Sequence, residues 1–355
     1  MKKITLLPGD GIGPEVLAEA KKVLEAVAET FGHSFDYTEA LIGAAAIDAT
    51  GNPFPAETLA ACQQADAILF GAIGDPKYDN DPKAKVRPEQ GLLAMRKQLG
   101  LFANVRPVKS YPLLEAASPL KADIIKGTDF VVYRELTGGI YFGQPRGRSE
   151  DGNTAFDTCV YSREEITRVA DFAFQAAQRR SGRLTLVDKA NVLATSRLWR
   201  EVVKEFAAEH YPDVSLDFLF VDNAAMQIIL NPSAFDVLLT ENMFGDIITD
   251  EASVITGSLG MLPSASLGAG VGLYEPIHGS YPQAAGKNIA NPMAAILSAA
   301  MLLESSFGLS AEAKKIEEAV EKALESKVVT SDIDASATRS TTEVGDFIAE
   351  FIRKG

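Results

Sequence analysis

Cysteine is scarce in this sequence. Only Cys62 and Cys159 carry a thiol among 355 residues, so we expect no disulfide framework. Such sparing use of cysteine is typical of proteins in the reducing cytoplasm. The apolar share of 46% and the charged share of 23% are those of a soluble globular protein.

Long apolar runs and excess positive charge are also missing. The longest apolar helix candidate, residues 293–303, is far shorter than the roughly 20 residues that a membrane span needs. The first apolar run covers only residues 4–7, so we expect no signal peptide. Acidic residues outnumber basic ones by 48 to 34, and the net charge of −14 disfavours nucleic acid and anionic membranes as partners. These features predict a soluble cytoplasmic protein.

The length of the chain and its alternating pattern indicate the fold class. A chain of 355 residues is too long for one ordinary core, which predicts two domains. Strand-like and helix-like segments alternate, with strands expected at 4–7, 35–42 and 65–74 and helices at 15–30 and after Pro55. This alternation predicts an α/β fold with a largely parallel sheet. Because such sheets bind ligands beyond the carboxyl ends of their strands, the polar loop 72–88 is a candidate binding loop.

The first glycine-rich motif, PGDGIGPE at residues 8–15, does not match the dinucleotide-binding fingerprint. That fingerprint requires G-x-G-x-x-G, and here the third glycine, Gly13, comes one residue early. We expect a strand, a tight loop and a helix that opens with Pro14. The motif therefore argues against a standard Rossmann fold.

Two aspartates, Asp246 and Asp250, lie four residues apart after the strand-like run 235–239. On a helix both carboxylates would face the same way and repel each other by roughly a few tenths of a kcal/mol. An exposed helix with two solvated acids is one interpretation, and a bound cation is the other. The flanking residues are mostly apolar or small, and a third acid, Asp222, also ends an apolar run. We favour a metal site, because three carboxylates suit Mg²⁺ or Mn²⁺.

Three arginines, Arg96, Arg106 and Arg134, stand in or at the ends of strand-like or helical runs. One arginine is usually a surface residue, but three in an acidic protein suggest bidentate binding of carboxylates. Together with a metal they indicate a substrate with more than one carboxylate. Lys189 directly follows a predicted strand, and is either an ordinary charge at a strand end or a catalytic base with a lowered pKa.

Two later segments are expected to be irregular. Residues 143–162 are loop-like or hairpin-like and predict a projecting arm. Ser162 and Glu165 then form a capping box for a helix over 162–181. The glycine-rich stretch 257–292 is too polar for a core, and we expect a long loop that lets a flat ligand or a phosphate approach the backbone.

The motifs together resemble the isocitrate/isopropylmalate dehydrogenase family of metal-dependent β-decarboxylating dehydrogenases over nearly the whole chain. The matching pieces are LLPGDGIGPEV, LFANVRP, RELTGGIYFG, VDKANVL, FGDI-TD, PSASLG, EPIHGS and AGK-IANP. The resemblance implies a two-domain α/β fold with a mixed, largely parallel sheet. It also implies a discontinuous nucleotide-binding domain, 1–101 and 257–355, and a dimerisation and metal-binding domain, 102–256, that carries the arm.

The resemblance further implies roles for individual residues. The substrate carboxylates would bind Arg96, Arg106 and Arg134, and the metal Mg²⁺ or Mn²⁺ would bind Asp222, Asp246 and Asp250. Lys189 and Tyr141 would be the proton-transfer pair. The protein would be an intimate homodimer in which Lys189 and Asp222 serve the partner's site.

The implied cofactor is NAD, held between the loop 75–89 and the segment 279–291. The expected contacts are Asp75, Glu89, His278 near the adenine, Gly279, Ser280, Gln283, Asn288 and Asn291. Members that use NAD usually carry an acid soon after the HGS motif, and this chain has Gln283 there. No lysine or arginine stands beside it to bind a 2′-phosphate, so NAD is favoured over NADP.

The implied reaction is the oxidative decarboxylation of a 3-substituted malate. The helix that carries Arg96 also offers Glu89, Leu92 and Leu93. This surface favours an alkyl branch, as in 3-isopropylmalate of leucine biosynthesis, over the third carboxylate of isocitrate. Homoisocitrate and tartrate are the other rival substrates, while a non-catalytic regulatory subunit and a metal-dependent phosphate-binding protein are the rival classes.

Overall fold

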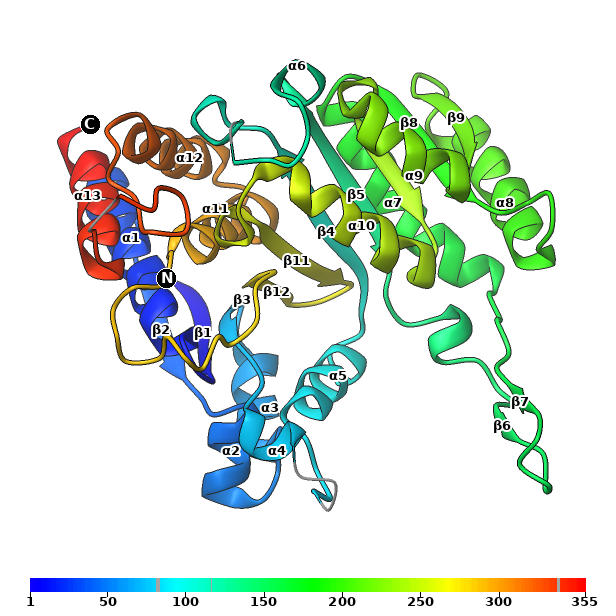
Figure 1. Ribbon diagram of the computed structural model, residues 1–355, viewed down its shortest axis with the longest axis horizontal. Helices are drawn as coiled ribbons and strands as arrows, with labels where there is room; N and C mark the ends of the chain where they lie inside the picture. Colours follow the sequence, from blue (N-terminus) through cyan, green and yellow to red (C-terminus); the bar gives the residue numbers. More distant parts are fainter. Residues whose placement is uncertain (81–83, 116, 337–338) are drawn as a thin grey trace. The chain divides into compact units, whose positions relative to one another are not determined.

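The chain forms two compact units in the computed structural model, which describes residues 1–80, 84–115, 117–336 and 339–355 (Figure 1). Unit 1 comprises Met1–Leu101 and Ser258–Gly355, and unit 2 is the continuous segment Phe102–Gly257. The sequence-based prediction placed the return of the chain from unit 2 to unit 1 at residue 257, one residue earlier than the structure does. The nucleotide-binding and dimerisation roles of the two units stay predictions.

The described residues of unit 1 form five strands in the order β2-β1-β3-β12-β11. Their bounds are β1 Lys2–Gly9, β2 Phe35–Glu39, β3 Ala67–Ala72, β11 Pro263–Gly268 and β12 Gly272–Pro276. Strand β3 pairs in parallel with β1 and β12, and β1 pairs in parallel with β2, whereas β12 and β11 are antiparallel. Strand β3 is buried along its whole length, as expected of the apolar run AILFGA inside a parallel sheet.

The prediction of a loop across the glycine-rich stretch is wrong for residues 263–276. These residues form the antiparallel pair β11 and β12, and β12 is buried throughout. Serine and glycine are weak strand formers, so the local pattern favoured a loop. Here the small residues let the helix α11, Met293–Phe307, pack on both strands. Residues 277–292 do form the expected irregular segment.

Helices cover the strands of unit 1. Their bounds are α1 Gly13–Phe31, α2 Gly43–Thr50, α3 Ala56–Gln64, α4 Pro76–Asp79, α5 Pro88–Gln98, α11 Met293–Phe307, α12 Ser310–Glu325 and α13 Thr341–Lys354, with a 3₁₀ turn at Leu259–Met261. Pro14 opens α1 as predicted. Helix α13 was not predicted, and it packs against α1 and α12.

Five strands of unit 2 lie in the order β4-β5-β10-β8-β9, apart from the hairpin β6 and β7 described below. Their bounds are β4 Leu101–Lys109, β5 Asp129–Glu135, β8 Arg183–Asp188, β9 Ser215–Phe220 and β10 Val237–Thr240. In this order β4 and β5 are antiparallel, whereas β5 and β10, β10 and β8, and β8 and β9 pair in parallel. With one antiparallel pair in each set of strands, the prediction of a mixed, largely parallel α/β fold is confirmed.

The helices of unit 2 are α6 Ala122–Ile125, α7 Arg163–Arg179, α8 Ala194–His210, α9 Val221–Leu230 and α10 Asn242–Thr256, with 3₁₀ turns η1 Pro112–Leu114, η2 Gly139–Tyr141 and η3 Pro232–Ala234. The predicted capping box of α7 is confirmed, because Glu165 N donates to Ser162 Oγ and Ser162 N donates to Glu165 Oε2. Within the described parts of both units, no helix is long and apolar enough to cross a membrane.

The predicted arm contains a small hairpin. Strands β6, Gly147–Arg148, and β7, Ala155–Phe156, are antiparallel and extend away from the other elements of unit 2 (Figure 1). Both strands are exposed along their length.

Candidate active site

Helix α10 presents the two aspartates that the spacing singled out. It starts directly after the buried strand β10, where Glu241 Oε1 accepts a hydrogen bond of 3.0 Å from Phe244 N. Phe244 and Ile248 are buried. The side chains of Asp246 and Asp250 are 39% and 73% exposed, so both carboxylates lie on the outer face of the helix.

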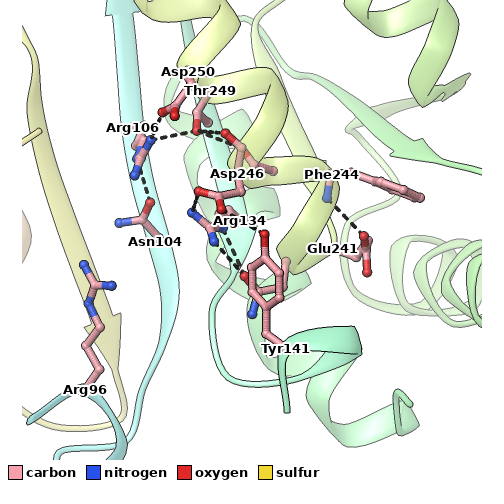
Figure 2. Close-up of polar contacts among 12 residues, drawn as sticks. Arg96, Asn104, Arg106, Arg134, Tyr141, Glu241, Phe244, Asp246, Thr249 and Asp250 are labelled. Carbon is pink, nitrogen blue, oxygen red and sulfur yellow. Dashed lines mark hydrogen bonds and ion pairs between the residues drawn. The ribbon is translucent and has the colours of Figure 1, made fainter. Parts of the chain in front are cut away.

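Asp246 binds two of the predicted site residues. Arg134, near the end of β5, donates from Nη1 to Asp246 Oδ1 over 2.6 Å, and Tyr141 OH donates to Asp246 Oδ2 over 3.0 Å (Figure 2). Burial, followed by the bond to Asp246, raises the pKa of the Tyr141 phenol. The phenol therefore keeps its proton at neutral pH and can act as a donor.

Asp250 forms a second ion pair one helical turn further along. Arg106, on β4, donates from Nη1 to Asp250 Oδ1 over 3.0 Å and to Thr249 Oγ1 over 2.8 Å. Its Nε donates to Asn104 Oδ1 over 3.0 Å (Figure 2). Each carboxylate of the repelling pair thus has its own guanidinium partner, which offsets the repulsion between them.

Asn242, a buried residue at the start of α10, was not predicted from the sequence. Its Oδ1 accepts from Arg134 Nε and Nη2 over 3.1 and 2.8 Å, and its Nδ2 donates to Gly138 O over 3.2 Å. Gly138 immediately precedes the 3₁₀ turn that carries Tyr141. Asn242 therefore fixes the Arg134 guanidinium and supports the Tyr141 turn. No spacing rule reveals this role, because it depends on β5 and β10 being neighbours.

A buried carboxylate also supports the same turn. Glu135 accepts from the backbone N–H groups of Thr137 and Gly138 over 2.9 and 2.7 Å, and from Thr137 Oγ1 over 2.9 Å. Burial raises the pKa of Glu135. These contacts fix the chain between β5 and Tyr141.

Lys189 and Asp222 form a separate pair in unit 2. Lys189 follows β8, Asp222 lies in the first turn of α9, and Lys189 Nζ donates to Asp222 Oδ1 over 2.5 Å. The contact with Lys189 holds the pKa of the Asp222 carboxyl below its ordinary value. Across residues 1–80, 84–115, 117–336 and 339–355, no three His, Cys, Asp or Glu side chains are grouped to hold a metal. The three predicted metal ligands are therefore not assembled within one chain.

Arg96 lies on α5 in unit 1. Its Nη2 donates to Glu275 Oε1 on β12 over 2.8 Å, while its buried Nε has no hydrogen-bond partner among the described residues. On the same helix Leu92 packs against the unit 1 core, and Leu93 is 54% exposed. Leu93 thus offers the larger free apolar surface.

Several predicted cofactor residues meet around Gly74. A Cβ built on Gly74 would lie 3.0 Å from Glu89 Oε1 and 3.5 Å from Ser280 Oγ, so these side chains converge on one point of the backbone. Asp75 caps α4 by accepting from Lys77 N over 2.9 Å. The part of the predicted loop at 81–83 lies outside the described residues.

His278 has a free ring nitrogen next to the segment 279–291. Its Nδ1 is 3.0 Å from Gly279 O, and its buried Nε2 has no partner among the residues that the structure describes. Burial lowers the pKa of the imidazole, which favours the neutral ring. A Cβ on Gly279 would meet no atom within 4 Å. A neutral ring with an unused nitrogen beside open backbone fits a hydrogen-bonding base such as adenine.

The remaining predicted cofactor residues differ in how their side chains are used. Asn288 Oδ1 accepts from Thr342 N over 3.0 Å at the start of α13, and Asn291 Oδ1 accepts from Met293 N over 3.0 Å at the start of α11. Both oxygens therefore cap helices. Gln283 is exposed in a turn.

Comparison with known proteins agrees with this arrangement. Residues 3–348 match the family described as isocitrate/isopropylmalate dehydrogenase. The chain is 59% identical over 346 residues to the 3-isopropylmalate dehydrogenase of Bacillus subtilis, covering 96% of this chain and 94% of that one. It is 54% identical over 354 residues to the same enzyme of Bacteroides fragilis, covering 99% of both.

A solved structure gives the same result for the fold. The isocitrate dehydrogenase from Methylococcus capsulatus superposes with a TM-score of 0.86 at 34% identity, over 99% of this chain and 100% of that one. The family match over nearly the full length, together with these relatives, shows that the chain belongs to the isocitrate/isopropylmalate dehydrogenase family.

Proposed function

We propose that the protein catalyses the oxidative decarboxylation of (2R,3S)-3-isopropylmalate to 4-methyl-2-oxopentanoate and CO₂ with reduction of NAD, a step of leucine biosynthesis. The observation that carries the proposal is the cluster in which Asp246 binds both Arg134 and Tyr141. In this proposal Arg134 binds a carboxylate, Tyr141 donates a proton and Asp246 is a metal ligand, and the hydrogen bonds among the three support these roles. The relatives named 3-isopropylmalate dehydrogenase, at 54–59% identity, support the choice of substrate.

The arginines bind the carboxylates of the malate in this proposal. Arg106 and Arg134 now neutralise Asp250 and Asp246. With a divalent cation held by Asp246 and Asp250, the guanidinium groups of Arg106 and Arg134 would be free to bind the substrate. Arg96, whose Nη2 donates to Glu275, would bind the substrate through its other N–H groups.

The metal is Mg²⁺ or Mn²⁺, because the ligands are carboxylate oxygens. Asp246 and Asp250 supply two of them, and the third comes from the partner subunit's Asp222. When bound, the metal supplies Lewis-acid stabilisation of negative charge on the substrate, and NAD accepts the hydride from C2.

Lys189 and Tyr141 move the protons. Lys189 accepts the proton of the C2 hydroxyl, and Tyr141 delivers a proton to C3 after CO₂ has left. The raised pKa of Tyr141 supports a role as proton donor. The bond from Tyr141 OH to Asp246 keeps the phenol next to the proposed metal ligands.

A homodimer explains why the three aspartates are not assembled in one chain. Helices α9 and α10 pack together in unit 2 and expose apolar side chains, namely Met226, Ile229, Leu230, Ile247 and Val254. Exposed apolar groups on neighbouring helices are typical of a protein–protein interface. We propose that a second copy of the chain covers them and brings its Lys189 and Asp222 to this site.

NAD is held by unit 1 in this proposal. The contacts are those predicted from the sequence: Asp75, Glu89, His278, Gly279, Ser280, Gln283, Asn288 and Asn291. The convergence of Glu89 and Ser280 on Gly74 and the unpartnered His278 Nε2 support this set. Because Asn288 Oδ1 accepts from Thr342 N, Asn288 would bind NAD through its other polar groups. Asn291 Nδ2 donates to Asp332 Oδ2 over 3.1 Å, so Asn291 would have to exchange this bond to contact NAD.

A substrate panel tests the proposal directly. The purified protein is assayed with NAD and Mg²⁺ against 3-isopropylmalate, shorter 3-alkylmalates, isocitrate and tartrate, and NADH formation is followed by absorbance. We expect the highest kcat/KM with 3-isopropylmalate, intermediate values for the shorter 3-alkylmalates, and an isocitrate rate lower by several orders of magnitude. Equal rates with isocitrate would refute the substrate, and no NADH with any 2-hydroxy acid would refute the reaction class.

A further inference from the structure

The motif PGDGIGPE at residues 8–15 has no role in the function proposed so far. We propose that this motif positions the two NAD-binding segments, with Asp10 and Glu15 as the positioning residues. The two segments are 72–75, which ends at Asp75, and 280–288. This inference rests on the proposed binding of NAD by unit 1.

Asp10 fixes the first segment through main-chain amides. It is 6% exposed, and its Oδ2 accepts from Gly74 N over 3.0 Å and from Ala44 N over 2.9 Å. Its Oδ1 accepts from Ala45 N over 3.0 Å. All three partners are donors, so they favour the ionised carboxylate against the burial that raises the pKa of Asp10. An asparagine would direct an N–H group at one or more of these donors.

The glycines of the motif allow the backbone to approach both segments. A Cβ on Gly9 would lie 1.9 Å from Ala72 O, and a Cβ on Gly11 would lie 2.0 Å from Ser280 O. Ile12 N donates to Ser280 O over 2.8 Å, and Asp10 N donates to Ala72 O over 2.9 Å. Gly13, the glycine that departs from G-x-G-x-x-G, is also closely packed, since a Cβ there would lie 2.2 Å from Pro8 O and 2.7 Å from Ala72 N.

Glu15 fixes the second segment from the first turn of α1. Its Oε2 accepts from Asn288 N over 3.1 Å, and its Oε1 accepts from Gly286 N. Asn288 has a φ of +54°, an unfavourable conformation that these bonds help to maintain. The turn containing Gln283 is thereby held at both ends, by Ile12 at Ser280 and by Glu15 at Gly286.

The two positioned segments meet at the proposed cofactor residues. Ser280 Oγ and Glu89 Oε1 both lie next to Gly74, the residue that Asp10 binds. A loss of either anchor would let one segment move relative to the other, so NAD would lose preformed contacts on that side.

The test compares Asp10→Asn and Glu15→Gln with the matched control Asp236→Asn. Asp236 lies in unit 2, is also 6% exposed, and accepts from Ser181 N over 3.0 Å and Arg180 Nε over 2.7 Å. NAD affinity of the full-length protein is measured by titration calorimetry, thermal stability by Tm, and local opening by amide hydrogen exchange. KM values for NAD and for 3-isopropylmalate are measured separately.

We expect Asp10→Asn and Glu15→Gln to raise Kd and KM for NAD about tenfold or more, with far smaller changes in KM for 3-isopropylmalate. Amide exchange should increase in 72–75 for Asp10→Asn and in 280–288 for Glu15→Gln. Asp236→Asn should lower Tm but leave the Kd for NAD unchanged. Because the Glu15 carboxylate is more exposed than that of Asp10, Glu15→Gln keeps the test valid if Asp10→Asn fails to fold.

The possible failures are distinguishable. If the wild-type protein does not bind NAD, the proposed function is wrong. If the wild-type protein binds NAD and Glu15→Gln binds it equally tightly, with unchanged exchange in 280–288, the positioning role is wrong. If the Asp236→Asn control lost NAD affinity to the same extent, the loss in the other variants would reflect general destabilisation. This result would also overturn the inference.

Discussion

The proposed catalytic cluster on α10 and the PGDGIGPE turn of unit 1 bring distant segments together by different means. On α10, Asp246 and Asp250 hold Arg134 and Arg106 through contacts between charged side chains. In the turn, Asp10 and Glu15 hold other segments through main-chain N–H groups. Substitutions should therefore have different effects in the two regions. Changes on α10 should alter chemistry, whereas changes in the turn should alter the affinity for a ligand.

The largest effect should follow removal of the metal from the α10 cluster. Exhaustive chelation, or Asp246→Asn, should lower turnover by roughly 10³-fold or more, because Lewis-acid stabilisation is worth several kcal/mol. Added Mg²⁺ or Mn²⁺ should restore the chelated wild type, as measured by NADH absorbance. The neighbouring acid Glu251 on the same helix offers a control, since Glu251→Gln should keep its activity. Full activity after chelation would disprove a catalytic metal at Asp246 and Asp250.

The next largest effect should come from Tyr141→Phe. Losing this acid should lower turnover by roughly 10²–10⁴-fold, with decarboxylation impaired more than hydride transfer. Because burial raises the pKa of Tyr141 from 10.0, its ionisation should not reduce activity until the pH exceeds 10. Tyr211→Phe is the matched control, since Tyr211 OH also donates to an aspartate, Asp171, elsewhere in unit 2. Wild-type turnover in Tyr141→Phe would disprove the assignment.

The α10 cluster was partly predictable because its signals are local. The i,i+4 spacing of Asp246 and Asp250 and the arginines near strand ends are visible in the sequence. The partner that orients Arg134, Asn242, was not visible, since its role depends on the order β5-β10 within unit 2. Side-chain types could thus be predicted, but their pairing could not.

The glycine-rich parts of unit 1 were predicted less well. The strands β11 and β12 were taken for a loop, because serine and glycine carry little strand signal of their own. The anchors made by Asp10 and Glu15 end on backbone N–H groups, which every residue type except proline has. Helix α13 was missed although its capping box, Ser340 and Glu343, stands in the sequence before an apolar pattern.

Substrate choice should depend on α5 by a smaller factor. Leu92→Ser or Leu93→Ser should lower kcat/KM for 3-isopropylmalate by up to about 100-fold. Each buried carbon of the branch contributes about 0.8 kcal/mol, and the serine side chain would lose part of this contact. Rates with isocitrate should change much less, so the preference for 3-isopropylmalate over isocitrate should become smaller. Leu92 also packs in the unit 1 core, so its variant should lose Tm, whereas the exposed Leu93 variant should not. An unchanged preference in both variants would mean that neither leucine contacts the branch.

Subunit mixing tests whether the α10 cluster is complete in one chain. Arg134→Ala and Lys189→Ala should each be inactive alone. If every site takes Arg134 from one subunit and Lys189 from the other, mixing should restore about a quarter of wild-type activity, because half of the dimers carry one intact site. Subunit exchange is verified by native mass spectrometry. No recovery despite exchange would place both residues in one subunit's site.

The smallest effect should come from Gln283, an exposed side chain in the segment that the PGDGIGPE turn positions. Gln283 is neutral, so it discriminates against the 2′-phosphate of NADP less than a carboxylate would. Gln283→Asp should raise the ratio of kcat/KM for NAD over NADP by about three- to tenfold, because an exposed charge interacts weakly across water. The gain should shrink at high ionic strength, and Gln283→Asn, which changes length but not charge, should leave the ratio nearly constant. If Gln283→Asp left the ratio unchanged at low salt, Gln283 would not face the ribose, and the turn held by Ile12 and Glu15 would serve another part of the nucleotide.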